Sequence, residues 1–268
     1  MNLFLEKLAE RQCGLVRSSA KVWITSHFRD LEPREYIIVD SLKLAYLNVP
    51  KAGCSSIKTK ILSLTNPDMA ASVDVDVHQY PWKTAGKRRD IPGGFTAFTL
   101  VRNPFARLVS AYKNKFVEFD RTQGFMYDNY LFNILHPDMT FAEFTDVVAK
   151  VPDRLADGHF KSQYAICFDP ICFKKGVMAA DHIWKLEDLD ARSDEIYRKT
   201  GLKDFPRSNQ SSDQNWEDYY CRESFENIRA RYRNDIDKFD YVAEENALEQ
   251  LLTRKDTAQR RAENRLDQ

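Results

Sequence analysis

The stretch 44-LAYLNVPKAGCSSIK-58 decides the fold, because it joins an apolar run to a tight turn and a helical pattern. Residues 44–49 form a short apolar run that is typical of a buried strand. Pro50 and Gly53 interrupt this run. The apolar positions that follow have the spacing of one helix face, at Cys54, Ile57, Ile61 and Leu64. The stretch therefore predicts a strand, a turn and a helix in direct succession.

A second unit of the same kind lies at 95-FTAFTLVRNPFARLVSAY-112. Phe95–Val101 predicts a buried strand that ends at Arg102. Asn103 is suited to cap a helix, and Pro104 fits the first helical position. The apolar face expected for this helix consists of Phe105, Leu108, Val109, Tyr112 and Phe116.

Strands are also predicted at Tyr36–Val39 and His182–Leu186. Further helices are predicted at 141–151 after the cap Thr140, at 188–200 before Gly201, and at 222–239. Strands that alternate with helices indicate the α/β class. We predict a P-loop-like three-layer fold, in which helices flank a central, mostly parallel sheet.

The length of 268 residues suits one large domain. We expect a core at about 36–241, an N-terminal lead-in at 1–35 and a charged C-terminal tail at 242–268. Within the tail, residues 254–268 are expected to form a frayed or solvated helix.

The charge balance of 40 Lys+Arg and 40 Asp+Glu gives no support for nucleic-acid binding. Charged side chains at positions 6, 7, 10 and 11 interrupt the apolar start. No stretch approaches the roughly 18 apolar residues of a membrane span. We therefore expect a cytoplasmic protein without a transmembrane segment, and leave open a peripheral contact with a membrane.

The cysteine count of 5 is odd, and no C-x-x-C pair occurs. This pattern indicates neither a disulfide scaffold nor a zinc site. A bridge between Cys167 and Cys172 stays open, beside the alternative of reduced thiols.

The turn at 50–56 carries groups that suit an anion. Gly53 lets the backbone approach closely, Ser55 and Ser56 offer hydroxyl donors, and Lys51 adds a positive charge. A Walker A loop is excluded, because its Lys follows the second Gly whereas Lys51 precedes Gly53. Taken alone, the loop equally fits an ordinary turn with a solvated Lys51.

Arg102 lies where the second strand gives way to a helix, and Ser110 lies two turns further on. Arg binds phosphate through forked hydrogen bonds. Taken alone, Arg102 is better explained by a structural salt bridge at a helix start than by a phosphate contact.

PKAGCSSIK at 50–58, followed by LVRNPFARLVSAYKNKF at 100–116, resembles the PAPS-dependent sulfotransferases of the carbohydrate group, sulfotransferase family 2. PAPS is 3′-phosphoadenosine 5′-phosphosulfate. Weaker similarity continues at 157-DGHFKSQ-163 with Cys167, where Phe160 and Ser162 replace the family's Trp and Pro. The remaining similar stretches are 184-WKLEDL-189, 205-FPRSNQS-211 and 237-DKFDY-241.

The resemblance implies a sulfotransferase that uses PAPS as co-substrate, releases PAP (adenosine 3′,5′-bisphosphate) and needs no metal. A carbohydrate or glycolipid hydroxyl is the expected acceptor. The 3′-phosphate would be held by Arg102 and Ser110, and Lys51 would neutralise charge on the leaving group. The 5′-phosphosulfate would be held by Lys51, Ala52, Gly53, Cys54, Ser55 and Ser56.

The acceptor hydroxyl also needs a base, for which His78 is the first candidate and His159 the second, while His182 is expected to be structural. His78 also fits a solvated loop residue.

Other groups left open are Lys83 and the basic cluster 87–89, which suit either an anionic glycan, the donor or plain solvation. Aromatic residues that suit either sugar stacking or the core are Tyr80, Trp82, Phe125, Tyr127 and Tyr130. Asn209 and Ser211 are candidates for closing the nucleotide site.

Two other functions stay open. A P-loop nucleotide kinase is disfavoured by the position of Lys51, and a non-catalytic nucleotide-binding module is disfavoured by the presence of Lys51, Arg102 and Ser110.

Overall fold

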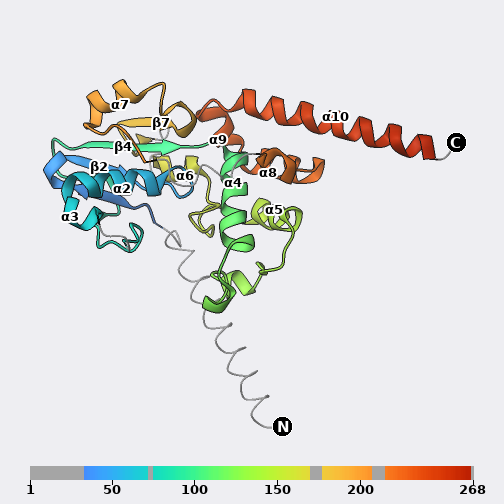
Figure 1. Cartoon of the computed structure of the whole chain (residues 1–268), viewed down its shortest axis with the longest axis horizontal. Helices are drawn as coiled ribbons and strands as arrows, with labels where there is room; N and C mark the ends of the chain where they lie inside the picture. Colours follow the sequence, from blue (N-terminus) through green and yellow to red (C-terminus); the bar gives the residue numbers. More distant parts are fainter. Residues whose placement is uncertain (1–32, 72–74, 170–176, 207–214, 267–268) are drawn as a thin grey trace, which may run out of the picture.

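The computed structural model describes residues 33–71, 75–169, 177–206 and 215–266. A five-stranded sheet lies at its centre, with the strand order β3-β1-β2-β4-β7 (Figure 1). Its strands are β1 (Tyr36–Val39), β2 (Leu44–Leu47), β3 (Thr84–Ala85), β4 (Thr96–Val101) and β7 (His182–Lys185). β2, β4 and β7 run parallel, whereas β1 is antiparallel to both β2 and β3. The structure thus confirms the predicted α/β class, and the parallel strands include both that lead into the predicted loops.

α-Helices pack on both faces of this sheet, and a small separate hairpin pairs β5 (Phe168–Asp169) with β6 (Val177–Met178). The helices are α2 (Cys54–Thr65), α3 (Pro67–Ala70), α4 (Pro104–Tyr112), α5 (Phe141–Lys150), α6 (Gln163–Cys167), α7 (Ser193–Thr200), α8 (Arg222–Arg231), α9 (Arg233–Lys238) and α10 (Val242–Leu266).

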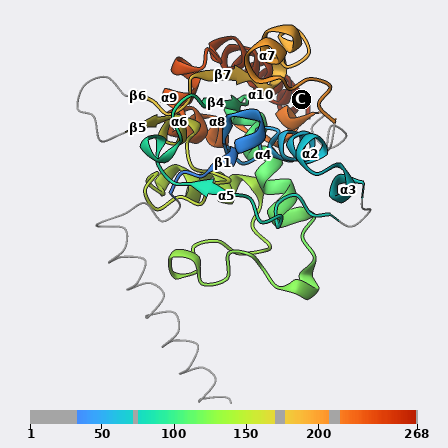
Figure 2. The ribbon, with the colours of Figure 1, turned by 90° about the vertical axis from the view of Figure 1, so that its left-hand side faces the viewer.

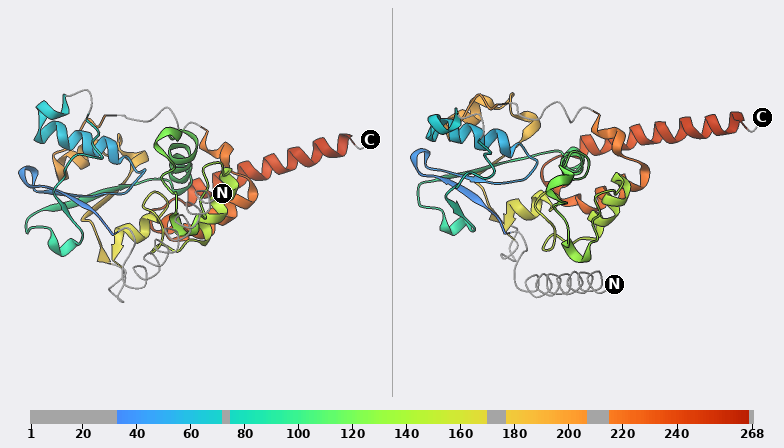
Figure 3. Two further views of the ribbon diagram at one scale, coloured as in Figure 1. Left: turned by 90° about the horizontal axis from the view of Figure 1, so that it is seen from below. Right: turned by 60° about the horizontal axis from the view of Figure 1, so that its bottom comes forward.

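Alternating side chains of the strands build a separate core on each face of the sheet. On β2, Leu44 and Tyr46 pack in the smaller core with Ile57 of α2 and Ile196 of α7. Their neighbours on β2 belong to the larger core, which holds side chains of α4, α5, α8, α9 and α10. Helices therefore cover both faces, as the views in Figures 2 and 3 show, and give the predicted three layers.

The predicted strand–turn–helix units fold as expected. Asn103 caps α4, because its side-chain oxygen accepts a hydrogen bond from Phe105 N at 2.9 Å, and Pro104 is the first helical residue. Thr140 and Glu143 form a capping box at the start of α5.

The C-terminal third differs from the prediction in two places. The single helix expected at 222–239 is divided into α8 and α9 at Tyr232, whose backbone (φ −106°, ψ 25°) leaves the helical region. The tail forms the 25-residue helix α10, which extends away from the body (Figure 1). Its first half extends the core past the expected limit of residue 241, since Leu248 and Leu252 are buried in the larger core. No helix within the described residues is both long and apolar enough to cross a membrane.

Candidate active site

The two predicted loops meet in one cleft of about 1350 Å³ beyond the carboxyl ends of β2 and β4. The site residues predicted from sequence that line it are Lys51, Gly53, Cys54, Ser55, Ser56, His78, Arg102, Ser110 and His159. Ala52, the remaining residue predicted for this loop, does not line the cleft, and it is buried in the larger core.

The first loop makes a tight turn that leads directly into the N-terminus of α2. Lys51 and Gly53 both have left-handed backbones, with φ of 65° and 80°. Gly53 occupies the N-cap of α2, and a methyl group there would lie 2.8 Å from Leu186 Cδ1. Because the first N–H groups of a helix have no acceptor within it, this turn can bind a negative group. Glycine at position 53 is thus required by backbone angle and by space.

Side-chain hydrogen bonds connect the first loop to the second. Arg102 Nη1 donates to the carbonyl oxygen of Lys51 at 3.2 Å. Lys51 Nζ donates to Asn114 Oδ1 at 2.6 Å, and Asn114 lies just after α4. Asn114 and Lys115 also line the cleft, although no local sequence pattern marked them as site residues.

The weaker stretches of family similarity converge on the second loop. Gln163 pairs with the backbone of Arg102 through both atoms of its side-chain amide. The N–H of Asn103 donates to Glu187 Oε1 at 2.8 Å, and the hydroxyl of Tyr241 donates to Glu187 Oε2 at 2.9 Å. Segments 157–163, 184–189 and 237–241 therefore brace the turn that carries Arg102.

Arg107 is a structural residue that the sequence did not reveal. Its side chain is 1% exposed, and its guanidinium donates to three carbonyl oxygens. These belong to Pro50 at 2.9 Å, Lys161 at 2.9 Å and Gly158 at 2.8 Å. Arg107 thereby fixes the entrance of the first loop relative to the segment that carries His159. A polar residue amid the apolar run of α4 was the available signal.

The two candidate bases have different partners. Ser55 Oγ lies 2.9 Å from His78 Nε2, so His78 contacts the first loop itself. His159 Nδ1 lies 2.7 Å from Asp157 Oδ1, and this carboxylate also accepts from the Tyr127 hydroxyl at 3.1 Å. An ionised Asp157 keeps the proton on Nδ1 and leaves Nε2 as a proton acceptor.

The surroundings of both imidazoles lower their pKa values and so favour the neutral ring. Burial lowers the pKa of His78, and the charge of Lys58 lowers it further. Burial likewise lowers the pKa of His159, although the hydrogen bond and charge of Asp157 oppose that effect. Near neutral pH each ring can therefore accept a proton.

The remaining basic, histidine and aromatic residues considered from the sequence do not line the cleft formed by the described residues. Lys83 pairs with Asp40 and Arg88 with Asp181. The ring of His182 stacks on Trp184 with centroids 5.2 Å apart. The aromatic residues Phe125, Tyr127 and Tyr130 pack in or against the larger core, Trp82 packs against the smaller core, and Tyr80 contacts Trp82.

Several predictions concern residues outside the described ranges, namely most of the lead-in (1–32), Cys172, Asn209 and Ser211. Cys167 is buried as a free thiol in the larger core. Among the described residues, no cluster of three or more His, Cys, Asp or Glu is arranged to hold a metal ion.

The remaining wall of the cleft mixes acidic and aromatic groups. Trp216 lines it and stacks on Phe105 with a centroid distance of 6.4 Å and an interplanar angle of 14°. Asp190, Asp204 and Phe205 line it as well. The cleft thus joins a cationic, glycine-containing turn to a surface that suits a flat, hydrogen-bonding ligand.

Comparison with known proteins agrees with this geometry. The family model described as "Sulfotransferase family" matches residues 34–242. The chain is 29% identical over 213 residues to carbohydrate sulfotransferase 14 of Danio rerio, covering 70% of this chain and 54% of that protein. It is 30% identical over 119 residues to carbohydrate sulfotransferase 8 of Homo sapiens and of Mus musculus, covering 40% of this chain and 28% of each. The chain thus spans about half the length, or less, of these curated relatives. No solved structure matches significantly.

Proposed function

The chain belongs to the sulfotransferase family, and from that premise we propose that it transfers a sulfuryl group from PAPS to a hydroxyl of a carbohydrate or glycolipid. The observation that carries this proposal is the meeting of the 50–56 loop with the loop of Arg102 and Ser110 in one cleft. The names of the relatives support a carbohydrate acceptor.

In this proposal the two loops bind the two ends of the donor. The turn from Lys51 to Ser56 holds the 5′-phosphosulfate with backbone N–H groups, hydroxyls and the Lys51 ammonium. Arg102 and Ser110 hold the 3′-phosphate, and Trp216 offers its ring to the adenine. PAPS supplies the sulfuryl group, and the part of the protein is to orient it and to stabilise charge.

The transfer needs three actions from side chains. The acceptor oxygen forms a bond to sulfur while the bond from sulfur to the 5′-phosphate oxygen breaks. The positive charge of Lys51 stabilises the negative charge that develops on that oxygen. The proton of the acceptor hydroxyl passes to an imidazole.

We assign this proton to His159 rather than to His78, which the sequence alone placed first. Asp157 fixes the tautomer and orientation of His159, an arrangement typical of a general base. His78 instead contacts Ser55 in the donor loop, so its proposed role is to orient that hydroxyl toward the sulfuryl group.

The two other functions gain no specific support. Lys51 precedes Gly53 and lies between the two loops, unlike the Walker Lys of a nucleotide kinase. A non-catalytic nucleotide-binding module does not account for the Asp157–His159 pair in the same cleft.

The test is transfer of labelled sulfate from PAPS to a panel of neutral and anionic carbohydrates and glycolipids, together with binding of PAP and ATP. We expect transfer to at least one member of the panel and stronger binding of PAP than of ATP. Lys51→Ala should lower kcat at least about 100-fold, whereas Lys150→Ala, which removes an exposed ammonium paired with Asp146 outside the cleft lining, should not. Preferred binding of ATP, or full activity of Lys51→Ala, would overturn the proposal.

A further inference from the structure

We propose that Gln163 and Asp235 are positioning residues that hold Arg102 for recognition of the donor's 3′-phosphate. The inference rests on the proposed function, because it assigns the origin of the preference for a 3′-phosphorylated nucleotide. Neither residue belongs to the loops themselves: Gln163 begins α6, and Asp235 lies in α9.

Gln163 is bound to the main chain of Arg102 at both of its polar groups. The N–H of Arg102 donates to Gln163 Oε1 at 2.8 Å, and Gln163 Nε2 donates to the carbonyl oxygen of Arg102 at 2.7 Å. The parallel pairing of β4 with β7 ends one residue earlier, at Val101. The amide of Gln163 therefore continues the ladder of hydrogen bonds and fixes the peptide groups on both sides of the Arg102 α-carbon.

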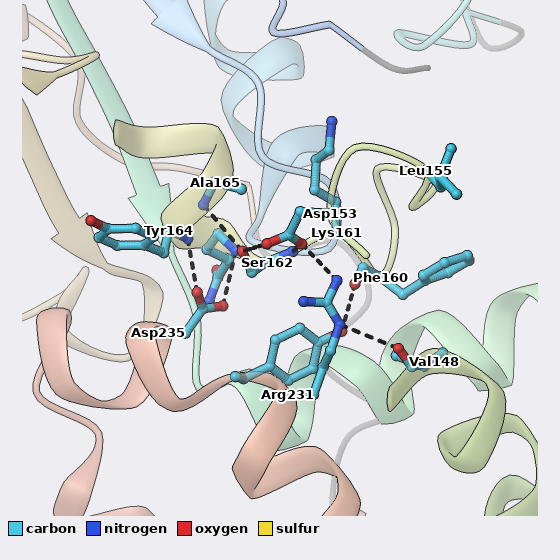
Figure 4. Close-up of polar contacts among 12 residues, drawn as sticks. Val148, Asp153, Leu155, Phe160, Lys161, Ser162, Tyr164, Ala165, Arg231 and Asp235 are labelled. Carbon is cyan, nitrogen blue, oxygen red and sulfur yellow. Dashed lines mark hydrogen bonds and ion pairs between the residues drawn. The ribbon is translucent and has the colours of Figure 1, made fainter. Parts of the chain in front are cut away.

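Asp235 fixes Gln163 in turn. Its carboxylate accepts from Gln163 N at 2.9 Å and from Tyr164 N at 2.8 Å, so both oxygens are used at the start of α6. Figure 4 shows Asp235 beside Tyr164. Gln163 and Asp235 are both 0% exposed. Since buried hydrogen bonds to a charged group are strong, the backbone of Gln163 has little freedom to shift.

This chain of contacts decides where the guanidinium of Arg102 can reach. Arg102 directly follows Val101, the last residue of β4 that pairs with β7. Its Nη1 contacts the carbonyl oxygen of Lys51 at 3.2 Å. If the amide of Gln163 is lost, the peptide groups beside Arg102 can rotate and the guanidinium leaves this position. The 5′-phosphate is bound by the 50–56 loop in the proposed function, so its contribution to nucleotide affinity should change little.

A neighbouring framework holds the same segment by a different route and provides a control. Asp153 accepts hydrogen bonds from Ser162 N at 2.8 Å and Ser162 Oγ at 2.7 Å. The hydroxyl of Tyr232 donates to the carbonyl oxygen of Phe160 at 2.7 Å. Removing the Tyr232 hydroxyl weakens the junction of α8 with this segment, but leaves Gln163 bound to Arg102.

The experiment compares the affinities of PAP and adenosine 5′-phosphate for one protein sample by calorimetry. These nucleotides differ only in the 3′-phosphate. The ratio of their dissociation constants therefore reports how well Arg102 binds that phosphate, and it does not depend on the folded fraction of the sample. We expect Gln163→Met to lower the preference for PAP about tenfold, which corresponds to the loss of one good contact. The isosteric Asp235→Asn should lower it several-fold, because the amide can accept only one of the two N–H groups.

Two further variants make the comparison decisive. Tyr232→Phe should leave the preference unchanged. The double variant Arg102→Ala/Gln163→Met should show the same preference as Arg102→Ala alone, because Gln163 acts through Arg102. Equal weakening of both nucleotides in Gln163→Met and Asp235→Asn, or additive effects in the double variant, would refute the positioning role. A wild-type protein without preference for PAP would instead refute the proposed function on which the inference rests.

Discussion

Gly53 and Leu186 pack so closely that a methyl group on the α-carbon of Gly53 would lie 2.8 Å from Leu186 Cδ1. The contact joins the turn before α2 to the segment that follows β7, two parts of the cleft that are far apart in the chain. Gly53 also has a φ of 80°, which disfavours any residue with a side chain. Steric space and backbone angle thus both favour glycine at position 53 of the proposed donor loop.

Gly53→Ala should therefore destabilise the protein and weaken nucleotide binding together. Left-handed backbone costs a non-glycine residue about 1–2 kcal/mol, and the contact with Leu186 must also be relieved by a shift of one segment. We expect a loss of about 2 kcal/mol in the free energy of unfolding and at least a tenfold weaker affinity for PAP. Urea denaturation and calorimetry measure the two effects.

Two other glycines separate the contributions. Gly94 has the same φ of 80° but open space around its α-carbon, so Gly94→Ala should show the backbone cost alone. Gly93 has open space and no left-handed backbone, so Gly93→Ala should be nearly neutral. If Gly94→Ala were as damaging as Gly53→Ala, the contact with Leu186 would not matter.

Arg107→Met should be strongly destabilising, because it leaves the carbonyl oxygens of Pro50, Gly158 and Lys161 without their donor. A buried acceptor that loses its partner costs about 1–3 kcal/mol. We expect the free energy of unfolding to fall by about 3 kcal/mol or more, measured by urea denaturation. Arg107→Lys retains the charge but not the forked geometry, and should fall between the wild type and Arg107→Met.

The matched control is Arg121→Met, which removes an exposed guanidinium paired with Asp138 at 2.8 Å. Exposed ion pairs contribute little to stability. The denaturation midpoint should therefore stay in place, and a comparable loss in both variants would show that the carbonyl contacts of Arg107 are unimportant.

The pH dependence of kcat/KM identifies the base. An imidazole base must be neutral, so kcat/KM should rise with pH and level off above the pKa of the base. Asp157 raises the pKa of His159, and its effect is opposed by burial. Asp157→Asn removes the carboxylate charge, so the pKa of His159 should fall and the rising limb should move to lower pH, with a lower plateau.

Asp76 gives the control for the other candidate, because its negative charge raises the pKa of His78. If His159 is the base, Asp76→Asn leaves the limb where it is. A limb that moves with Asp76→Asn and not with Asp157→Asn would transfer the role to His78. Both profiles use the acceptor that the transfer assay identifies.

Local patterns in the sequence predicted the parts of the fold that local chemistry determines. The Asn103-Pro104 pair marked the start of α4, and the structure shows the cap that the pattern implies. Both strand–turn–helix units follow from apolar spacing and from residues that end a strand. The boundary between α8 and α9 has no such signal, since neither Gly nor Pro occurs near Tyr232.

The contacts that assemble the site are long-range and carry no periodic signal. Lys51 and Asn114 are 63 positions apart, and Gln163 and Arg102 are 61 positions apart. Most of these contacts join a side chain to a main-chain group, which any residue type can provide. The sequence could therefore nominate Lys51 and Arg102 as ligand-binding residues, but not the side chains that hold them.

Asp235 gives the last prediction, because it is a fully buried carboxylate amid charges from several elements. Burial raises the pKa of Asp235 to about 6, while the N–H groups of Tyr164 and Gln163 and the charge of Arg107 oppose that effect. Asp153 raises this pKa further. The charge of Asp235 in turn raises the pKa values of Arg231, Tyr232 and Cys167.

The folded protein thus holds this proton more tightly than the unfolded chain, for which 3.8 is the ordinary pKa. The associated stability is fully present below the unfolded pKa and is lost as the pH rises through about 6. From pH 7.5 to pH 5, the wild type should therefore gain about 1 kcal/mol in unfolding free energy relative to Asp235→Asn. Urea denaturation of both proteins at the two pH values measures this difference, and protonation of the histidines cancels in the comparison. Parallel pH profiles would mean that Asp235 is already ionised without penalty, and that its contacts with α6 outweigh the cost of its burial.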